Sequence, residues 1–452
     1  MPQARFLTGS TLRHVVVMSI AGSLGLSFLF LIDFLAMFWV SQYDDAQMIA
    51  AVGFAFSIQF FPASMNLGMM IATVALFARA LGGGQVERAR QIATMGILTG
   101  TAVQIVVSAV LWHYRHDLLA WSGATGATRD MAADFLSVSL CGMPLMVAGM
   151  TMAAVVRATG DAVRSTLVTG IAAAVALVVD PFNIIVLELG VTGAGLSVVI
   201  TRSVMTVLGL YYLVRVHNMA AAPRRAAFAA YFRPWVLIAI PSVLTQCSTP
   251  FGNWVLMRAM APYGDEATAG LSVVLRLIVM VFAGIFALSG AIGGILGQNF
   301  GGGRLDRVAQ AYKDALKYCL AYTAIAWAAL WLGNDALTRG FGLSGPGAEV
   351  MRSFTHLVAP TLVFTGALFV ANAAFNNLGR PIYATLANWI RDGLFTYPLA
   401  LLFSASYGAT GVMMGYAGAG ILSGVIGAWI GWRYVCRLRA RAAPLDAPVA
   451  DA

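Results

Sequence analysis

Six ionisable side chains interrupt the apolar segments of this 452-residue chain, and they are the groups whose chemistry stands out first. A charge inside an apolar segment long enough to cross a bilayer is costly unless it is paired or hydrated, so each one is a candidate functional residue. Two carboxylates that face one low-dielectric cavity cannot both ionise cheaply, and they can therefore share a proton. The six residues are Asp33, Asp180, Arg202, Arg276, Arg391 and Asp392.

Three of the six lie at similar depth in the first half of the chain. At about 1.5 Å per helical residue, Asp33 lies roughly 11 Å from the end of its segment, Asp180 roughly 14 Å and Arg202 roughly 17 Å. Pro181 directly follows Asp180 and frees the backbone carbonyl of Leu177, as in the broken helices of transporter sites. We predict that Asp33 and Asp180 bind a coupling proton or cation.

Other roles for these charges stay open at this point. Arg202 could neutralise one of the two acids permanently, as a buried ion pair with no further function. In the second half, a cavity contact and a structural role are equally compatible with Arg276, Arg391 and Asp392. Neighbouring residues point about 100° apart on an α-helix, so Arg391 and Asp392 need not pair with each other.

The composition defines the elements that must position these residues. The chain is 60% hydrophobic and 10% charged, whereas a soluble domain carries about 25% charged residues. We therefore predict an all-α polytopic membrane protein rather than a water-soluble or nucleic-acid-binding one. Twelve transmembrane helices are predicted over residues 14–40, 48–78, 92–113, 133–157, 165–189, 191–215, 233–258, 267–297, 313–332, 351–378, 382–404 and 408–433.

An internal repeat divides the twelve segments into two sets of six. The phrase Ala80–Arg88, with three glycines, an acid and an arginine, recurs 219 residues later as Asn299–Arg307. Six segments per half leave both halves facing the same way, so we predict two six-helix bundles related by a parallel repeat. The predicted organisation is an N-terminal lobe (1–219), a cytoplasmic linker (220–232), a C-terminal lobe (233–436) and a cytoplasmic tail (437–452).

Two more glycine positions support the repeat. Gly160 falls on Gly379 at the same offset, and with one residue of slippage the Gly190–Gly193 stretch falls on Gly408–Gly411. The glycine-rich phrases lack the lysine and Ser/Thr of a nucleotide-binding loop, so we interpret them as helix ends. The sequence therefore predicts no bound nucleotide at these loops.

The distribution of basic residues predicts the orientation. The termini and the loops after even-numbered segments carry 20 of the 28 lysines and arginines, and loops after odd-numbered segments carry five. We therefore expect both termini to be cytoplasmic, in a multi-pass protein of the inner cell membrane. No cluster of residues has catalytic or metal-ligand spacing, and the four cysteines are scattered, so we expect no enzyme activity, cofactor or metal site.

Several short stretches along the chain form a recognisable set: Leu31–Phe34, Ile49–Gly53, Arg157–Asp161, Asp180-Pro181, Gly190–Gly195, Leu275-Arg276 and Gly297–Gly301. In these stretches the chain resembles the multidrug and toxic compound extrusion (MATE) transporters, in particular the branch named after DNA-damage-inducible protein F. The resemblance implies two bundles around a central cavity, a monomer, and export of organic, often cationic or amphiphilic, compounds by alternating access. It also implies proton coupling through Asp33 and Asp180.

Three departures from the family pattern affect the expected mechanism. The proline common in the first segment of family members is not found near Ser19–Ala21, and the asparagine that they carry one turn before the second aspartate is here Ala176; both affect the detailed mechanism of the N-terminal lobe. The glutamate of sodium-linked relatives falls near Ser248-Thr249, where no acid is present, so we expect protons rather than sodium as the coupling ion. The main alternative is a flippase for lipid-linked oligosaccharides, although such proteins often have a strongly cationic cavity and the six charges here sum to zero.

Overall fold

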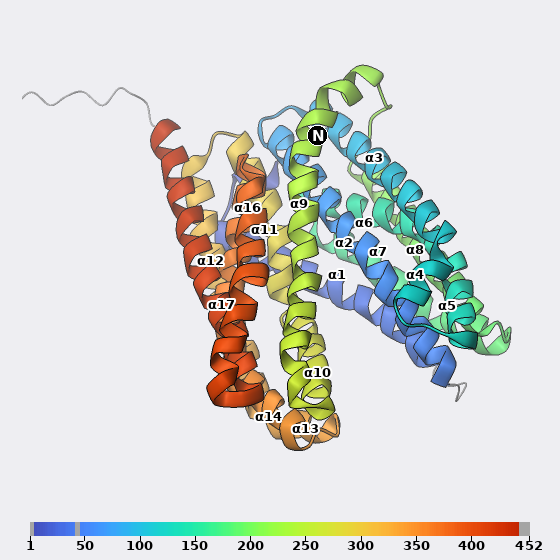
Figure 1. Cartoon of the computed structure of the whole chain (residues 1–452). Helices are drawn as coiled ribbons and strands as arrows, with labels where there is room; N and C mark the ends of the chain where they lie inside the picture. The colour runs from blue at the N-terminus through green and yellow to red at the C-terminus, as the bar shows by residue number, and fades with distance from the viewer. Residues whose placement is uncertain (1–3, 41–45, 443–452) are drawn as a thin grey trace, which may run out of the picture. The chain divides into compact units, whose positions relative to one another are not determined.

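The computed structural model describes residues 4–40 and 46–442, except for the side chains of helical residues 33, 34, 36, 37, 46, 227 and 442. This described part contains helices and no β-strand (Figure 1), as predicted. The first half comprises α1 (Thr11–Val40), α2 (Ala46–Gly82), α3 (Val86–His113), α4 (Arg115–Trp121), α5 (Gly126–Ser139), α6 (Met143–Ala158), α7 (Ala162–Pro181) with the π-helix η4 (Phe182–Val186), and α8 (Gly190–Tyr211) with η5 (Tyr212–Val216).

The second half repeats the pattern with more interruptions. Its helices are α9 (Arg225–Met260), α10 (Asp265–Val281), α11 (Ala283–Gly301), α12 (Leu305–Leu332), α13 (Asn334–Gly340), α14 (Gly345–Ser353) with the π-helix η7 (Phe354–Val358), α15 (Ala359–Leu378), α16 (Pro381–Trp389) with η8 (Ile390–Phe395), and α17 (Thr396–Ala442). Short 3-10 turns precede α1 and follow α5 and α9.

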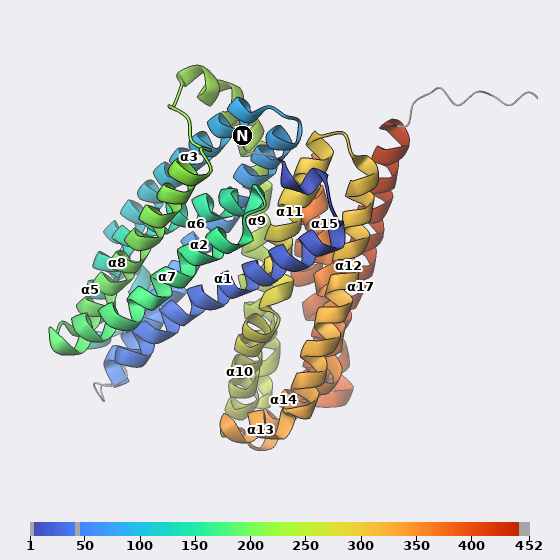
Figure 2. The same cartoon turned by 180° about the vertical axis from the view of Figure 1, so that it is seen from behind.

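The predicted eighth segment is divided into two helices. It was expected as one helix over residues 267–297, but the structure ends α10 at Val281 and begins α11 at Ala283 (Figure 2). The Tyr322 hydroxyl donates to the Val281 carbonyl (2.9 Å) and accepts from the Gly284 amide (3.3 Å). Because this side chain satisfies backbone groups at the break, the interruption is compatible with a buried helix.

The last two predicted segments form one continuous helical run with a reversal inside it. Eleven described segments are long and apolar enough to cross a bilayer, and the last, Pro381–Arg441, has 61 residues. Gly408 has a left-handed φ of 57°. Beyond it, a Cβ on Gly411 would collide with the Phe403 carbonyl, and one on Gly415 with the Ala400 backbone. The two limbs are therefore antiparallel, so this one described segment contains the last two predicted transmembrane helices.

The repeat is visible in the backbone as well as in the sequence. Glycines with left-handed φ angles recur in pairs that are 219 residues apart, or 218 in the last pair, so the same turns are built in each half. The pairs are Gly84 and Gly303, Gly123 and Gly342, Gly126 and Gly345, Gly160 and Gly379, and Gly190 and Gly408. The predicted two-repeat architecture is confirmed.

Contacts within the described chain divide it into two compact units. Unit 1 contains residues 17–77 and 85–247, and unit 2 contains residues 4–16, 78–84 and 248–442. Each unit has a core of small and aliphatic side chains from neighbouring helices, as expected where packing rather than water exclusion holds helices together. The exact lobe and linker boundaries predicted from the sequence remain a proposal.

Candidate functional site

The helix that carries Asp33 packs against the helix that carries Asp180. Residue 33 lies in α1, and its side chain is outside the described part of the chain. Ile32 and Leu35, on either side of it, are buried in one cluster with Ala172 of α7. The two predicted coupling residues are therefore on adjacent helices of unit 1.

Asp180 is buried in unit 1 where α7 changes into the π-helix η4. Its side chain is only 1% exposed. Next to it, the Asn183 amide donates to the Ser197 hydroxyl of α8 (3.0 Å), and that hydroxyl donates to the Val179 carbonyl (3.3 Å). A π-helical turn widens the helix and often marks a functional site. The geometry places an acid, an amide and a hydroxyl together inside an apolar unit.

Asn183 and Ser197 were not predicted as site residues from the sequence. Asn183 follows Asp180 by three residues, so helical spacing could have placed it near the acid. It supplies an amide beside Asp180, whereas the residue one turn before the acid is Ala176. Ser197 is 14 residues further along and on another helix, and only the packing of α7 against α8 brings it into the site.

Arg202 is buried on α8 and contacts a third helix. Its Nη1 donates to the Ser139 carbonyl at the end of α5 (3.2 Å), and Gln59 of α2 donates to the Ser139 hydroxyl (2.5 Å). The aliphatic part of the Arg202 side chain lies close to Gly142, where a Cβ would be 3.1 Å from Arg202 Cδ. A larger residue at position 142 would therefore press on this arginine.

The charges of the second half do not form one cluster. Arg276 is an exposed residue of α10, whereas its neighbours Leu277 and Ile278 are buried. Arg391 and Asp392 lie in the π-helix η8 and are 7% and 3% exposed. Of these three charged residues of unit 2, Arg276 is therefore accessible, whereas Arg391 and Asp392 are enclosed.

Arg391 and Asp392 form a two-pronged ion pair, which the sequence had left open. Arg391 Nε lies 2.7 Å from Asp392 Oδ1, and Nη2 lies 2.9 Å from Oδ2. In a regular α-helix neighbouring residues point apart, but the widened turn and the long arginine side chain allow the guanidinium to fold back onto its neighbour. Gly252, the repeat equivalent of position 33, leaves room for this carboxylate, because a Cβ there would be 2.9 Å from Asp392 Cγ.

A small aromatic cavity adjoins the pair in unit 2. It has a volume of about 40 Å³, enough for a water molecule but not for an organic compound. Its polar lining comes from Arg391, Tyr416 and two threonines, and the rest of the lining includes Phe282, Phe286 and Phe369.

Asp161 fixes the start of the helix that carries Asp180. Its Oδ1 accepts from the Arg164 amide (3.0 Å), and its Oδ2 accepts from Arg164 Nη1 (2.7 Å) and lies 3.2 Å from His217 Nε2. Burial alone would raise the pKa of this carboxyl, but the Arg164 hydrogen bonds and the charges of Arg164 and His217 outweigh burial and lower it. The ionised carboxylate therefore stabilises unit 1.

We expect Asp161→Ala to lower the free energy of unfolding by about 1 kcal/mol at neutral pH, the usual value for a lost N-cap. Because the folded-state pKa is lowered, this contribution is present above the unfolded value of about 3.9 and is lost as the pH falls below it. In thermal unfolding of the purified proteins, the difference in stability between wild type and Asp161→Ala should therefore disappear in that acidic range. Asp130→Ala, which removes an exposed acid of α5, should change little.

The fold and the buried site define a class of proteins, the two-repeat polytopic transporters. The MatE family model matches residues 21–182 and again residues 241–402, so it covers most of the chain and follows the repeat. The chain therefore belongs to the MATE family, a family of transporters and not of enzymes. The resemblance predicted from the sequence is confirmed at this level, and the narrower branch assignment remains a prediction.

Individual relatives cover nearly the whole chain. The chain is 25% identical to the FAD transporter of Shewanella oneidensis over 449 residues, which is 97% of each protein. It is 24% identical to the multidrug export protein MepA of Staphylococcus aureus over 84% of each. The crystal structure of the Vibrio cholerae MATE transporter VcmN in the bent form matches with a TM-score of 0.90 at 19% identity, covering 96% of this chain and 98% of VcmN. These comparisons support an exporter of organic compounds.

Proposed function

We propose that this chain is a proton-coupled efflux transporter that exports organic, often cationic or amphiphilic, compounds by alternating access. The observation that carries the proposal is the burial of Asp180 beside an interrupted helix, on the helix that packs against the Asp33-bearing part of α1. An ionisable group in such a place is costly to keep unless it has a function. Reversible protonation is the function that a buried carboxylate suits best.

In the proposed cycle, Asp33 and Asp180 share one proton binding site in unit 1. Protonation removes the charge from the apolar interior and favours one conformation, and loss of the proton to the other side favours the alternative conformation. Asn183 and Ser197 supply hydrogen-bonding groups next to Asp180 that can follow this change. Arg202, buried on the same helix as Ser197, supplies a fixed positive charge five residues away.

Protons are a better match than sodium for this arrangement. Sodium, as a hard cation, is held by several oxygen ligands, usually including carboxylates. The buried intramembrane acid of η8, Asp392, is already held by Arg391, and Ser248 and Thr249 stand where sodium-linked relatives carry an acid. The coupling carboxylates are therefore proposed to lie in unit 1.

Two further classes of compound are candidate substrates. The Shewanella relative is named a FAD transporter and matches along the whole chain, so a flavin nucleotide is included among the candidate substrates. A lipid-linked oligosaccharide is the alternative from the same superfamily. We also propose that the protein is a monomer in the inner cell membrane. The distribution of its basic residues predicts that both termini are in the cytoplasm.

Transport into proteoliposomes tests the proposal directly. The purified protein should move a cationic dye, or FAD, when a pH gradient alone is imposed, and should not do so when a sodium gradient alone is imposed. The same vesicles loaded with a fluorescent lipid-linked sugar test for flippase activity. Sodium-driven transport in the absence of any pH gradient would contradict proton coupling, and lipid translocation without export of soluble compounds would contradict the efflux function.

A further inference from the structure

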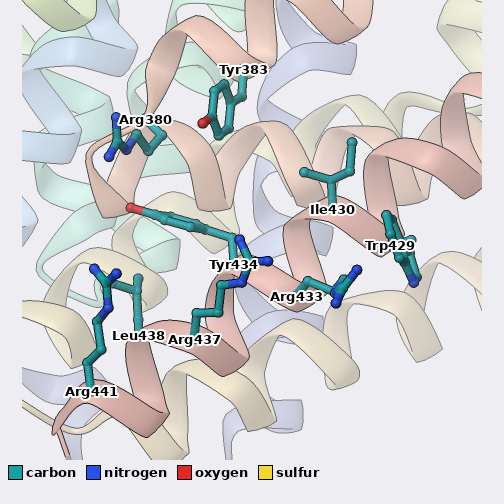
Figure 3. A pocket seen from close by; sticks show the side chains of 9 residues that line it. All are labelled: Arg380, Tyr383, Trp429, Ile430, Arg433, Tyr434, Arg437, Leu438 and Arg441. Atoms are coloured by element: carbon teal, nitrogen blue, oxygen red, sulfur yellow. The ribbon is translucent and has the colours of Figure 1, made fainter.

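We propose that unit 2 carries a binding site for the headgroup of an anionic phospholipid, formed by the start of α16 and the last turns of α17. A cavity of about 270 Å³ opens there, with four guanidinium groups and several aromatic rings in its wall (Figure 3). The residues that carry the argument are Arg380, Arg433, Arg437, Arg441, Trp429 and Tyr434.

Helix geometry gathers the charges on one face of α17. Trp429, Arg433, Arg437 and Arg441 follow one another at intervals of four residues, so their side chains lie in one row. Arg380 faces this row from the turn that precedes α16 (Figure 3). The cavity therefore has a basic row on one side and a further arginine opposite.

Two contacts hold the wall of the cavity in place. The Tyr434 hydroxyl donates to the Leu378 carbonyl at the end of α15 (2.8 Å), which fixes α17 against the turn that carries Arg380. The Arg433 guanidinium lies 4.7 Å from the centre of the Trp429 ring, a cation–π contact that orients its donors. The site is thus organised before any ligand enters it.

The four arginines concentrate positive charge, and the described part of the chain places no acid in contact with them. Among the described residues, no carboxylate oxygen lies within 4.0 Å of their guanidinium nitrogens. Their neighbour Arg439, outside the cavity, does have such a partner, Asp306, at 2.5 Å. Like charges held close together favour binding of an anion, and guanidinium groups match the geometry of a phosphate.

The surroundings favour a lipid over a soluble phosphate. On α17, Leu422, Val425 and Ile426 are exposed on the turns before Trp429, and on α16 Ile382 and Leu386 are exposed beside the cavity. This apolar surface continues directly into the basic row. Acyl chains can therefore lie along it while the phosphate contacts the arginines at the level of the headgroups, as in other basic pockets between membrane helices.

Lipid titration of the purified full-length protein tests this site. Phosphatidylglycerol, added to the protein in a neutral detergent, should form adducts that are detected by native mass spectrometry and should raise the unfolding temperature. Phosphatidylcholine should bind at least several times more weakly, because it has no net charge. Soluble glycerol 3-phosphate at the same concentration should neither bind nor stabilise. Equal binding of both lipids, or binding of glycerol 3-phosphate as tight as that of the lipid, would overturn the proposal.

Matched double variants locate the binding. Arg433→Gln with Arg437→Gln should weaken phosphatidylglycerol binding roughly tenfold or more, given the contribution of each basic residue near an anionic lipid. Arg224→Gln with Arg225→Gln removes the same charge from exposed positions of unit 1 and should leave binding unchanged. If the first variant is poorly folded, Arg380→Gln, at an exposed turn, provides the same comparison. Equal loss in both double variants would show a general charge effect and contradict the site.

Discussion

Replacing Asp33 by asparagine should reduce pH-driven export to the level of protein-free vesicles. Asparagine keeps the size of the side chain and removes the group that binds and releases the proton, so the protein should still insert and fold. The expectation rests on an ionisable group inside a membrane helix and on the packing of that part of α1 against α7. The measurement is dye efflux from proteoliposomes with equal amounts of wild-type and variant protein.

The matched control for this variant is Asp117→Asn, which removes an exposed acid of α4. It should export at the wild-type rate, since its carboxylate is solvated and lies outside the proposed site. If the Asp33 variant is well folded and exports as fast as wild type under the same pH gradient, Asp33 does not couple transport to protons.

Removing one partner of the Arg391–Asp392 pair should be strongly destabilising. Arg391→Leu leaves a buried carboxylate without its guanidinium, and such a loss costs about 3–5 kcal/mol. The double variant Arg391→Leu with Asp392→Leu removes both charges and should regain much of the lost stability, because no uncompensated charge remains. Unfolding of the purified proteins in detergent, followed by circular dichroism, measures both effects.

An exposed ion pair in the same unit provides the comparison. Arg439 and Asp306 have side chains that are 60% and 79% exposed, and an exposed pair contributes about 0–1 kcal/mol. Arg439→Leu should therefore lower the stability by no more than that amount. If Arg391→Leu were as mild as Arg439→Leu, the buried pair would not be a stabilising element of unit 2.

The fold was largely predictable because its determinants are local in sequence. Apolar length predicted the twelve crossings, and the recurring glycines marked the turns, which the left-handed φ angles of Gly190 and Gly408 bear out. The break at Phe282 was missed because the Tyr322 hydroxyl that satisfies it comes from 41 and 38 residues away in sequence. The hydropathy of a segment does not show that a hydroxyl from a distant helix will bond to its backbone.

The candidate site was predictable only in part. The sequence identified Asp180 as a costly charge, and the structure buries it, whereas Ser197 reaches the site only through the packing of two helices. The sequence left open whether Arg391 and Asp392 pair, because it does not show where a helix changes to a π-helical turn. Rules for neighbouring side chains hold for regular helices, and functional segments often depart from them.

The adjacency of Arg391 and Asp392 also bears on how the chain enters the membrane during synthesis. A lone charged residue opposes insertion of its helix by about 2.5–3.5 kcal/mol. Asp180 and Arg202 lie 22 residues apart, on different helices, so neither can offset the other until both helices are in place. Arg391 and Asp392 bring their opposite charges together within one turn of η8. The segment can thus pass from the translocation machinery into lipid already neutralised, without waiting for any other helix.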